Sequence, residues 1–358
     1  MKRHLFAVLV GLCLVGRTAS SQPPDPTMTV HFIEVGQALA ALVEFPCGAM
    51  MVDTGSQDDA ADRRLIAYLK DFFATRTDLN KTFDEVLITH NHIDHTNSLQ
   101  HVVENFTVKR YIDDGFTTGS GTPRTNWLRT QVRTHQRAVQ IRAIKDTEIT
   151  NLPTKDGLTD SFIDPFNCGS VDPQVRILSG RLTTNPGWSA KDFANLNNHS
   201  LVTRIDFGQA SVLFLGDTEL PASDLLLQYY SGPASQILNA DILQVAHHGS
   251  RNGTSQALVA AVTPKLAIIP VGHWSDGRKP PKTFSTYAYG HPNQGTLDLL
   301  AAGIDGDRGT PIDVMAGTAA KTFQKATVTK AIYTTDWDGT LLITATTAGK
   351  LAVRRTHR

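Results

Sequence analysis

Two spacings of hydrophobic residues alternate along the chain. Short runs in which apolar residues alternate with polar ones, or follow one another directly, indicate β-strands. We expect strands at residues 29–35, 38–45, 49–52, 86–88, 175–178, 200–207, 210–215, 242–246, 266–271, 331–334 and 340–344. We expect helices at residues 58–73, 98–104, 123–144 and 296–302. In the first helix, Leu65, Leu69 and Phe72 recur at helical spacing. Strands and helices alternate in two halves, which predicts an α/β fold.

The strand at residues 86–88 is followed directly by a cluster of side chains that can bind metal. His90, His92, Asp94 and His95 lie within one short loop. Imidazole and carboxylate groups suit zinc and related divalent metals, and four of them this close can contribute to two adjacent ions. A polar loop rich in histidine is the other interpretation. We disfavour it because histidine is uncommon and this cluster ends an apolar strand.

The composition fits a globular protein and does not point to a partner by charge. Of the 358 residues, 41% are hydrophobic and 19% are charged, which allows a substantial core. The formal net charge is zero with histidine neutral. The overall charge therefore gives no argument for binding to nucleic acid or acidic lipid.

The N-terminus has the layout of a secretory signal peptide. Two basic residues precede an apolar run at 5–15, and small polar residues follow at 18–21. The run is too short to span a bilayer, which takes about 20 apolar residues. We expect residues 1–21 to be a signal peptide and residues 22–28 a flexible leader. The mature chain would then be secreted or periplasmic, without stable membrane insertion; an uncleaved anchor is the alternative.

Two cysteines, Cys47 and Cys168, remain after the signal peptide. An exported location permits a disulfide between them. Their separation in space is not readable from the sequence, so two free thiols fit equally well. Neither cysteine has the spacing of a metal ligand.

The interval 105–195 separates two groups of motifs, and we expect it to be an extended insertion. Its predicted helix carries Arg129, Arg133 and Arg137 at every fourth position, so the three form one stripe on a helix. Such a stripe can hold a phosphodiester backbone, and a solvated helix face is the alternative. At the other end of the chain, we expect residues 349–358 to be a disordered basic tail.

The cluster after residue 88 carries a resemblance to a known family. The run from His90 to His95 resembles the H-x-H-x-D-H signature of the metallo-β-lactamase superfamily. Further segments resemble the soluble hydrolase domain of ComEC-type competence proteins, in that family's order. These segments are residues 32–37, 52–55, 197–202, 215–217, 247–250 and 290–292. The resemblance implies an αββα four-layer sandwich with a dinuclear metal site, over residues 29–348.

The chain departs from that family in two respects. ComEC-type proteins are multi-pass membrane proteins, whereas this chain resembles a free-standing, exported version of one domain. The family also carries Gly-Gln-Gly-Asp-Ala after the first strand, whereas here Gln37 is followed by Ala38, Leu39 and Ala40. The missing carboxylate puts in doubt any contact that the family makes there.

The resemblance also implies a set of metal ligands. For the first metal, the implied ligands are His90, His92 and His199. For the second metal, they are Asp94, His95 and His247. Asp217 would bridge the two ions, and Asp53 would shape the metal loop through hydrogen bonds without binding metal. The implied cofactors are two divalent metal ions; the histidine count favours zinc, and manganese is the alternative.

Such a site would activate a hydroxide for attack on a phosphorus or carbonyl centre. Asp94 would orient the hydroxide, and His248 would face the substrate. His291 would protonate a leaving oxygen or hold a phosphate, with a plain turn histidine as the alternative. Ser250 would donate to a phosphate oxygen, with a local cap as the alternative.

These interpretations predict an exported metal-dependent hydrolase. A phosphodiesterase or nuclease that acts on DNA, or on another phosphodiester, is the first hypothesis. A hydrolase of a small ester, lactone or β-lactam is the second. A non-catalytic binding protein is the third, and the complete ligand set argues against it. The oligomeric state stays open at this point.

Overall fold

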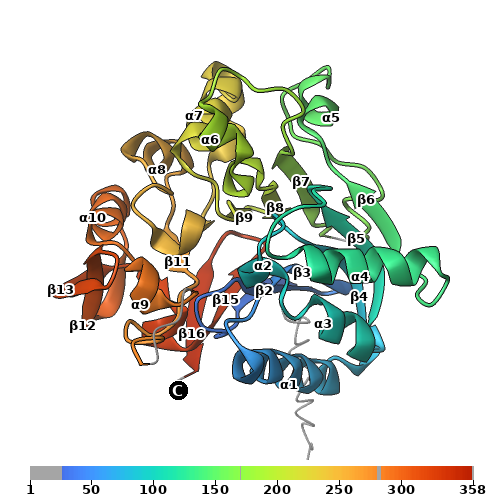
Figure 1. Cartoon of the computed structure of the whole chain (residues 1–358), viewed down its shortest axis with the longest axis horizontal. Coiled ribbons are helices and arrows are strands. Elements are labelled where there is room, and N and C mark those ends of the chain that lie inside the picture. The colour runs from blue at the N-terminus through green and yellow to red at the C-terminus, as the bar shows by residue number, and fades with distance from the viewer. Residues whose placement is uncertain (1–25, 170, 280–283, 357–358) are drawn as a thin grey trace, which may run out of the picture.

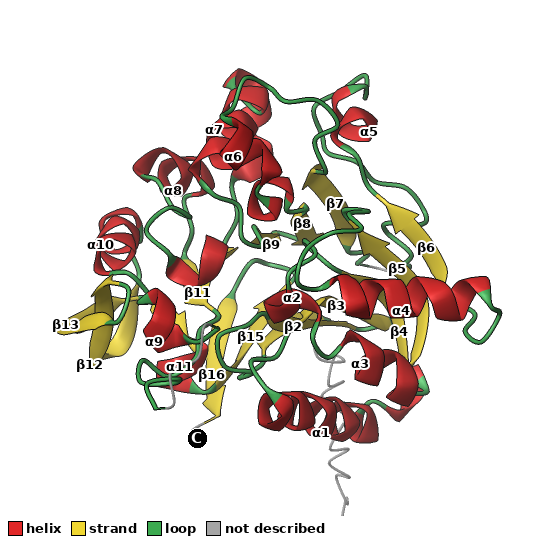
Figure 2. Ribbon diagram, viewed as in Figure 1, coloured by secondary structure: helices red, strands yellow, loops and turns green. Residues whose placement is uncertain are grey.

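The computed structural model describes residues 26–169, 171–279 and 284–356. Two β-sheets pack face to face at its centre, and helices cover the outer side of each sheet (Figure 1). Figure 2 shows the same arrangement as strands enclosed by helices. The chain thus has the four layers of an αββα sandwich, as predicted.

The larger sheet has the strand order β16-β15-β1-β2-β3-β4-β5-β6. Its strands are β1 (Thr27–Phe32), β2 (Ala40–Phe45), β3 (Gly48–Thr54), β4 (Thr82–Leu87), β5 (Thr107–Asp113), β6 (Gln140–Ala143), β15 (Thr340–Thr346) and β16 (Leu351–Thr356). From β3 to β6 the strands run parallel. The carboxyl ends of β3 and β4 therefore lie at the same edge of the sheet.

The smaller sheet has the order β14-β11-β10-β9-β8-β7. Its strands are β7 (Gln174–Ser179), β8 (Val202–Phe207), β9 (Ala210–Phe214), β10 (Ile242–Gln244), β11 (Leu266–Ile269) and β14 (Ile332–Thr334). The run from β9 through β10 and β11 to β14 is parallel. A separate hairpin, β12 (Asp307–Ala319) with β13 (Thr322–Lys330), extends from this half.

Helices fill the outer layers and the connections. The α-helices are α1 (Asp59–Thr75), α2 (Ile93–Thr96), α3 (Leu99–Asn105), α4 (Thr122–Arg133), α5 (Asp146–Thr150), α6 (Ala190–Ala194), α7 (Leu220–Tyr229), α8 (Gln256–Val262), α9 (Thr286–Tyr289), α10 (Gln294–Gly303) and α11 (Thr335–Asp338). Short 3-10 helices are η1 (Thr77–Leu79), η2 (Leu196–His199), η3 (Gly232–Leu238) and η4 (Ala246–Gly249). In Figure 1, α1, α3 and α4 lie on the larger sheet, and α7, α8 and α10 lie on the smaller one.

Strands in the middle of the two sheets, such as β2, β3 and β9, are buried on both faces, which explains their continuous apolar runs. Along β2, Val43 and Phe45 point into the core between the two sheets. Leu42 points to the opposite face, into the core beneath α1, α3 and α4. Alternate side chains of one strand thus join the two sheets and the outer helix layer.

Helix α1 covers the larger sheet with one apolar face. Its N-terminus is capped by Asp58, whose side chain accepts hydrogen bonds from the backbone N–H groups of Ala60 and Ala61. Leu65 and Leu69 are fully buried on the face toward the sheet. The residues whose spacing predicted the helix are therefore the ones that pack against the sheet.

Both ends of the described chain are more ordered than expected. Strand β1 begins at Thr27, so the leader predicted for residues 22–28 is wrong at its last two positions. Residues 351–356 of the predicted disordered tail form β16, which pairs with β15. The predicted signal peptide lies outside the described residues.

The interval 105–195 is not a simple insertion. Its strands β5 and β6 extend the larger sheet, and β7 forms an edge of the smaller sheet. The helix predicted over 123–144 ends at Arg133 with α4, and β6 follows it. Arg137 therefore lies beyond the helix, and the three arginines do not form a helical stripe.

Cys47 and Cys168 form a disulfide, with their Cα atoms 5.0 Å apart. The bond joins the β2–β3 turn to the loop that precedes β7. Of the two alternatives left open by the sequence, a disulfide and two free thiols, the structure shows the disulfide. In the part of the chain that the structure describes, no helix is long and apolar enough to cross a membrane.

Candidate metal centre

The side chains that can bind metal gather where strands of the two sheets end. The loop after β4 carries His90, His92, Asp94 and His95, and Asp217 follows β9. After β10, η4 contributes its two adjacent histidines. Carboxyl ends of parallel strands thus bring residues that are more than 150 positions apart into one site.

Four of these side chains form a compact group. Ligand atoms of Asp94, His95, Asp217 and His248 all lie within 4.8 Å of one another. His95 Nε2 lies 3.2 Å from Asp217 Oδ1, and His248 Nε2 lies 3.4 Å from Asp94 Oδ2 and 3.6 Å from Asp217 Oδ2. Two carboxylates and two imidazoles are a donor set that suits a divalent metal.

Unsatisfied atoms show that this group fits a metal ion. His95 Nε2, Asp217 Oδ1 and His248 Nε2 are buried and make no hydrogen bond among the described residues. Buried polar atoms are normally hydrogen-bonded, because leaving one unpaired costs about 1–3 kcal/mol. Three such atoms that face one another match the place of a bound cation.

Neighbouring groups fix which nitrogen each histidine presents. His95 Nδ1 donates to Asp53 Oδ2 at 2.6 Å, and His248 Nδ1 donates to the Pro270 carbonyl at 2.7 Å. Asp53 also accepts from the Thr89 N–H at 2.7 Å. These contacts turn the Nε2 atoms of both histidines toward Asp217, as in metal sites whose ligands are held by outer hydrogen bonds.

His90 and His92 form a second pair of imidazoles beside Asp217. His90 Nε2 and His92 Nδ1 are 3.0 Å apart, and His90 Nε2 is 4.0 Å from Asp217 Oδ2. Two ring nitrogens that face each other beside a carboxylate suit a second cation. Asp217 Oδ2 thus lies within 4.0 Å of a ring nitrogen from each group.

The charges in the group favour ionised carboxylates. Burial lowers the pKa of His95, but the negative charges of Asp217 and Asp53 outweigh burial and raise this pKa well above its usual range. Burial raises the pKa of Asp217, but the nearby His95 and His248 outweigh it and hold this pKa well below its usual range. The carboxylate is therefore in the form that binds cations.

The sequence model of one protein family, the metallo-β-lactamase superfamily, matches residues 33–273 of the chain. The chain belongs to this superfamily. The membership predicted from the His90–His95 run is thereby confirmed, and the match includes all the residues of the group described above.

Two curated proteins are similar to this chain over a small part of their own length. Recombination protein 2 of Haemophilus influenzae is 38% identical over 84 residues, which is 24% of this chain and 10% of that protein. ComE operon protein 3 of Bacillus subtilis is 25% identical over 225 residues, which is 62% of this chain and 22% of that protein. The chain thus spans less than a quarter of the length of either relative.

One solved structure is similar to the chain at a low TM-score. The metallo-β-lactamase fold protein YhfI of Bacillus subtilis is 16% identical, with a TM-score of 0.39, over 73% of this chain and 94% of that one.

The positions of the two adjacent histidines differ from the expected arrangement, and which of them binds metal stays a prediction. His248, predicted to face substrate, lies in the metal group, whereas His247, predicted as the ligand, lies at its margin. His247 Nε2 is 4.0 Å from Asp217 Oδ2, and its Nδ1 pairs with Asn252 Oδ1 at 3.1 Å. Both histidines adopt left-handed backbone angles, with φ of 51° and 52°, so the chain turns sharply after β10.

His199 is not brought to the metal group. Its Nδ1 accepts from the Leu182 N–H at 3.1 Å, and its Nε2 donates to the Phe193 carbonyl at 2.7 Å. Both ring nitrogens are therefore occupied, and the ring is buried against Phe116 and Phe193. The prediction of His199 as a ligand disagrees with this geometry.

Asn197, which the sequence reasoning missed, reaches the site instead. Its Nδ2 donates to Glu219 Oε1 at 2.9 Å and lies 3.3 Å from His247 Nε2. Its buried Oδ1 makes no hydrogen bond among the described residues. The signal was present, because Asn197 stands two positions before His199 in the same motif.

The arginines and Ser250 do not face the metal group. Arg129 donates to Asp113 at 2.5 Å and lies over the Tyr111 ring, whereas Arg133 is exposed. The Ser250 hydroxyl donates to Asn252 Oδ1 at 2.7 Å, within its own loop. The hydroxyl of Ser250 is thus engaged in a local contact, in line with the alternative to a phosphate contact.

A pocket of about 430 Å³ opens onto the metal group. Its lining includes Gln37, Asn197, Phe284, Tyr289 and His291 besides the ligand side chains. Burial and the neighbouring His247 and His248 lower the pKa of His291 well below its usual range, so this imidazole is neutral.

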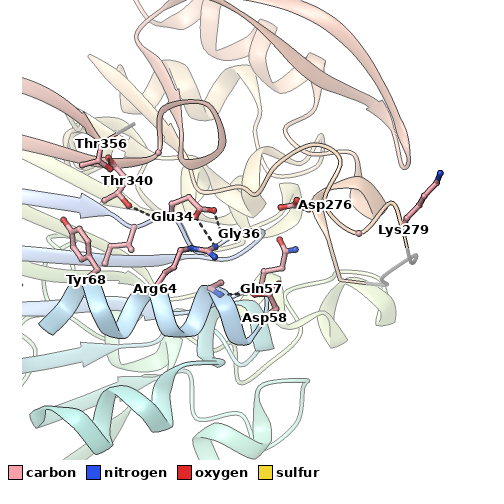
Figure 3. Close-up of a pocket in the computed structure, with 14 residues that line it drawn as sticks. Glu34, Gly36, Gln57, Asp58, Arg64, Tyr68, Asp276, Lys279, Thr340 and Thr356 are labelled. Atoms are coloured by element: carbon pink, nitrogen blue, oxygen red, sulfur yellow. Dashed lines mark hydrogen bonds and ion pairs between the residues drawn. The ribbon is translucent and has the colours of Figure 1, made fainter. Parts of the chain in front are cut away.

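A larger cavity of about 750 Å³ lies beyond Gln57 (Figure 3). Glu34 and Arg64 form an ion pair across it at 3.1 Å. The Gln37 N–H donates to Gln57 Oε1 at 2.8 Å, so this contact links the wall of the cavity to the wall of the metal pocket. The described lining of the cavity holds no histidine, and the metal group lies outside it.

Proposed function

We propose that this chain is a metal-dependent phosphodiesterase that hydrolyses DNA. The observation that carries the proposal is the arrangement of two ligand groups beside Asp217, with three buried ligand atoms that face one another and form no hydrogen bond among the described residues. The name of one relative, which refers to recombination, supports a role with DNA. Both relatives are much longer than this chain, so their activities enter here as part of the proposal.

Two divalent metals would be held by this chain's residues. Asp94, His95 and His248 would hold one ion, and His90 and His92 the other. Asp217 would be shared by the two ions. The imidazole-rich set favours zinc, with manganese as the alternative. When bound, such metals lower the pKa of water toward neutrality and neutralise the negative charge that develops on phosphoryl oxygens.

The chain's own residues position the substrate and handle its protons. Asp94 lies 3.4 Å from His248 and opens onto the pocket, where its carboxylate can orient the attacking water. His291 faces the same pocket as a neutral imidazole that can donate a hydrogen bond to a phosphate oxygen. Phe284 and Tyr289 give the pocket an aromatic wall.

We also propose that the chain is exported, to a secreted or periplasmic location. The support is the basic-then-apolar N-terminus together with the Cys47–Cys168 disulfide, because disulfides persist in oxidising compartments. Cell fractionation that finds the uncleaved chain in the cytosol would contradict export.

The substrate class is tested by comparing substrates side by side. The chain is stripped of metal, reloaded with zinc or manganese, and offered single-stranded DNA, double-stranded DNA and a chromogenic cephalosporin. We expect metal-dependent cleavage of DNA with the cephalosporin intact. Cephalosporin turnover with intact DNA would overturn the proposal in favour of a small-ester or β-lactam hydrolase.

A further inference from the structure

Gln37 and His291 form a buried pair at the wall of the metal pocket. Gln37 Nε2 lies 3.0 Å from His291 Nδ1, and Gln37 is fully buried. The Thr286 hydroxyl donates to Gln37 Oε1 at 3.0 Å. With its oxygen engaged by Thr286, the amide turns its N–H₂ group toward the imidazole.

This contact determines which ring nitrogen of His291 carries the proton. An amide N–H₂ can only donate, so His291 Nδ1 must accept and be unprotonated. A neutral imidazole then carries its proton on Nε2. That atom makes no hydrogen bond within the described part of the chain, and His291 lines the pocket beside Asp94 and Asp217.

Other contacts hold the imidazole and the amide in place. The ring of Tyr289 stacks on His291, with centroids 5.6 Å apart and planes at 26°. Gly290 has a φ of 73°, and a Cβ on it would lie 2.2 Å from the Ala319 carbonyl oxygen, so the turn fits closely against the β12–β13 hairpin. The backbone N–H of Gln37 is fixed by Gln57.

We propose that Gln37 is a positioning residue that makes His291 a neutral hydrogen-bond donor to an oxygen of the scissile phosphodiester. Because Gln37 holds the proton on Nε2, His291 offers an N–H to the substrate without carrying a positive charge toward the metal ions. Its role is then to stabilise negative charge on oxygen, and not to act as an imidazolium acid. The proposal rests on the proposed phosphodiesterase function for the identity of the substrate.

The direct test reads the tautomer and does not need turnover. The zinc-loaded chain is labelled with ¹⁵N-histidine, and the two-bond ¹H–¹⁵N couplings of each ring are recorded at neutral pH; His291→Asn identifies the His291 signals. We expect His291 to be protonated on Nε2 alone. In Gln37→Glu, a carboxylate that can only accept should move a proton to Nδ1.

Kinetics give the second readout. Removing one donor to a developing oxyanion typically costs about 10²–10³ in kcat. We expect Gln37→Glu to lower kcat for DNA by about 100-fold at similar KM, and Thr286→Val, which frees the amide to rotate, to have a smaller effect of the same kind. Gln136→Glu, the same change at an exposed position outside the metal pocket, is the matched control.

The outcomes separate the two proposals. A His291 ring protonated on Nδ1 in the wild type, or on both nitrogens, would overturn the positioning role, and so would an unchanged tautomer and kcat in Gln37→Glu. A chain that cleaves only the cephalosporin would contradict the DNA substrate, while the tautomer measurement would still decide the role of Gln37.

Discussion

The carboxylate of Asp53 accepts a hydrogen bond from His95 Nδ1 at 2.6 Å, and this contact turns His95 Nε2 toward Asp217. Both side chains are fully buried. Asp53 lies near the end of β3, and His95 lies in α2, which follows β4. Asp53 is thus not among the candidate ligands, yet the orientation of one of them depends on it.

Replacement of this carboxylate tests that dependence. Loss of an outer partner of a ligating histidine typically costs 10–100-fold in metal affinity. We expect Asp53→Asn to weaken zinc binding by about this factor, measured by competition with a chromogenic chelator. Asp62→Asn is the matched control, because Asp62 accepts from His101 at the same distance of 2.6 Å outside the metal group. Equal zinc affinity in the two variants would contradict the role of Asp53.

The two adjacent histidines after β10 should differ in their effect on metal content. His248 lies in the ligand group, whereas His247 lies at its margin. We expect His248→Ala to bind fewer zinc equivalents than the wild type, as measured by mass spectrometry of the native protein. His247→Ala and His199→Ala should keep the wild-type zinc content. Loss of zinc in His247→Ala, with full content in His248→Ala, would restore the assignment made from the sequence.

This pair also shows where the sequence falls short. The signature from His90 to His95, and the strands that precede each motif, were sufficient to predict the superfamily, the sandwich and the place of the site. The assignment of His247 relied on its position nearest the strand end. The left-handed backbone of both histidines turns the second one inward, and no residue type in the sequence requires that turn.

Other differences have similar physical causes. The stripe of arginines required α4 to continue past Arg133, but the helix ends there and its Arg129 pairs with Asp113. His199 was assigned by motif position, whereas its ring is taken up by backbone groups. The β12–β13 hairpin was missed because much of it is exposed on both faces, so it lacks a buried alternation.

Arg129 gives a prediction about stability. Its guanidinium donates to the buried carboxylate of Asp113, and hydrogen bonds to charged groups contribute about 1.5–3 kcal/mol. We expect Arg129→Gln to lower the free energy of unfolding by about 2 kcal/mol in chemical denaturation. Arg133→Gln, at an exposed position of the same helix, should change it by less than about 0.5 kcal/mol. Equal effects would show that the ion pair does not stabilise the fold.

Asp114 gives a prediction about pH. Burial and the neighbouring Asp113 raise the pKa of this carboxyl group from 3.8 to about 7. Between these values the folded state binds more protons than the unfolded state, so the free energy of unfolding falls as pH rises from about 4 to 7. We expect Asp114→Asn to be more stable than the wild type at pH 8, with the difference vanishing near pH 4.

Denaturant titrations at several pH values check this sign. The exposed Asp305→Asn is the control and should follow the wild-type pH dependence. A wild-type chain that gains stability relative to Asp114→Asn as pH rises would show that the Asp114 carboxylate is stabilised in the folded state.

The most direct test of the metal centre is a zinc titration of phosphodiester hydrolysis by the metal-stripped chain. Turnover of bis-p-nitrophenyl phosphate would be followed in the wild type, in Asp94→Asn and in the control Asp62→Asn. We expect turnover to appear with zinc in the wild type and in the control, and to be absent in Asp94→Asn at every zinc concentration. Turnover that persists after chelation, or that survives in Asp94→Asn, would contradict a metal-dependent reaction at the centre formed by Asp94, His95, Asp217 and His248.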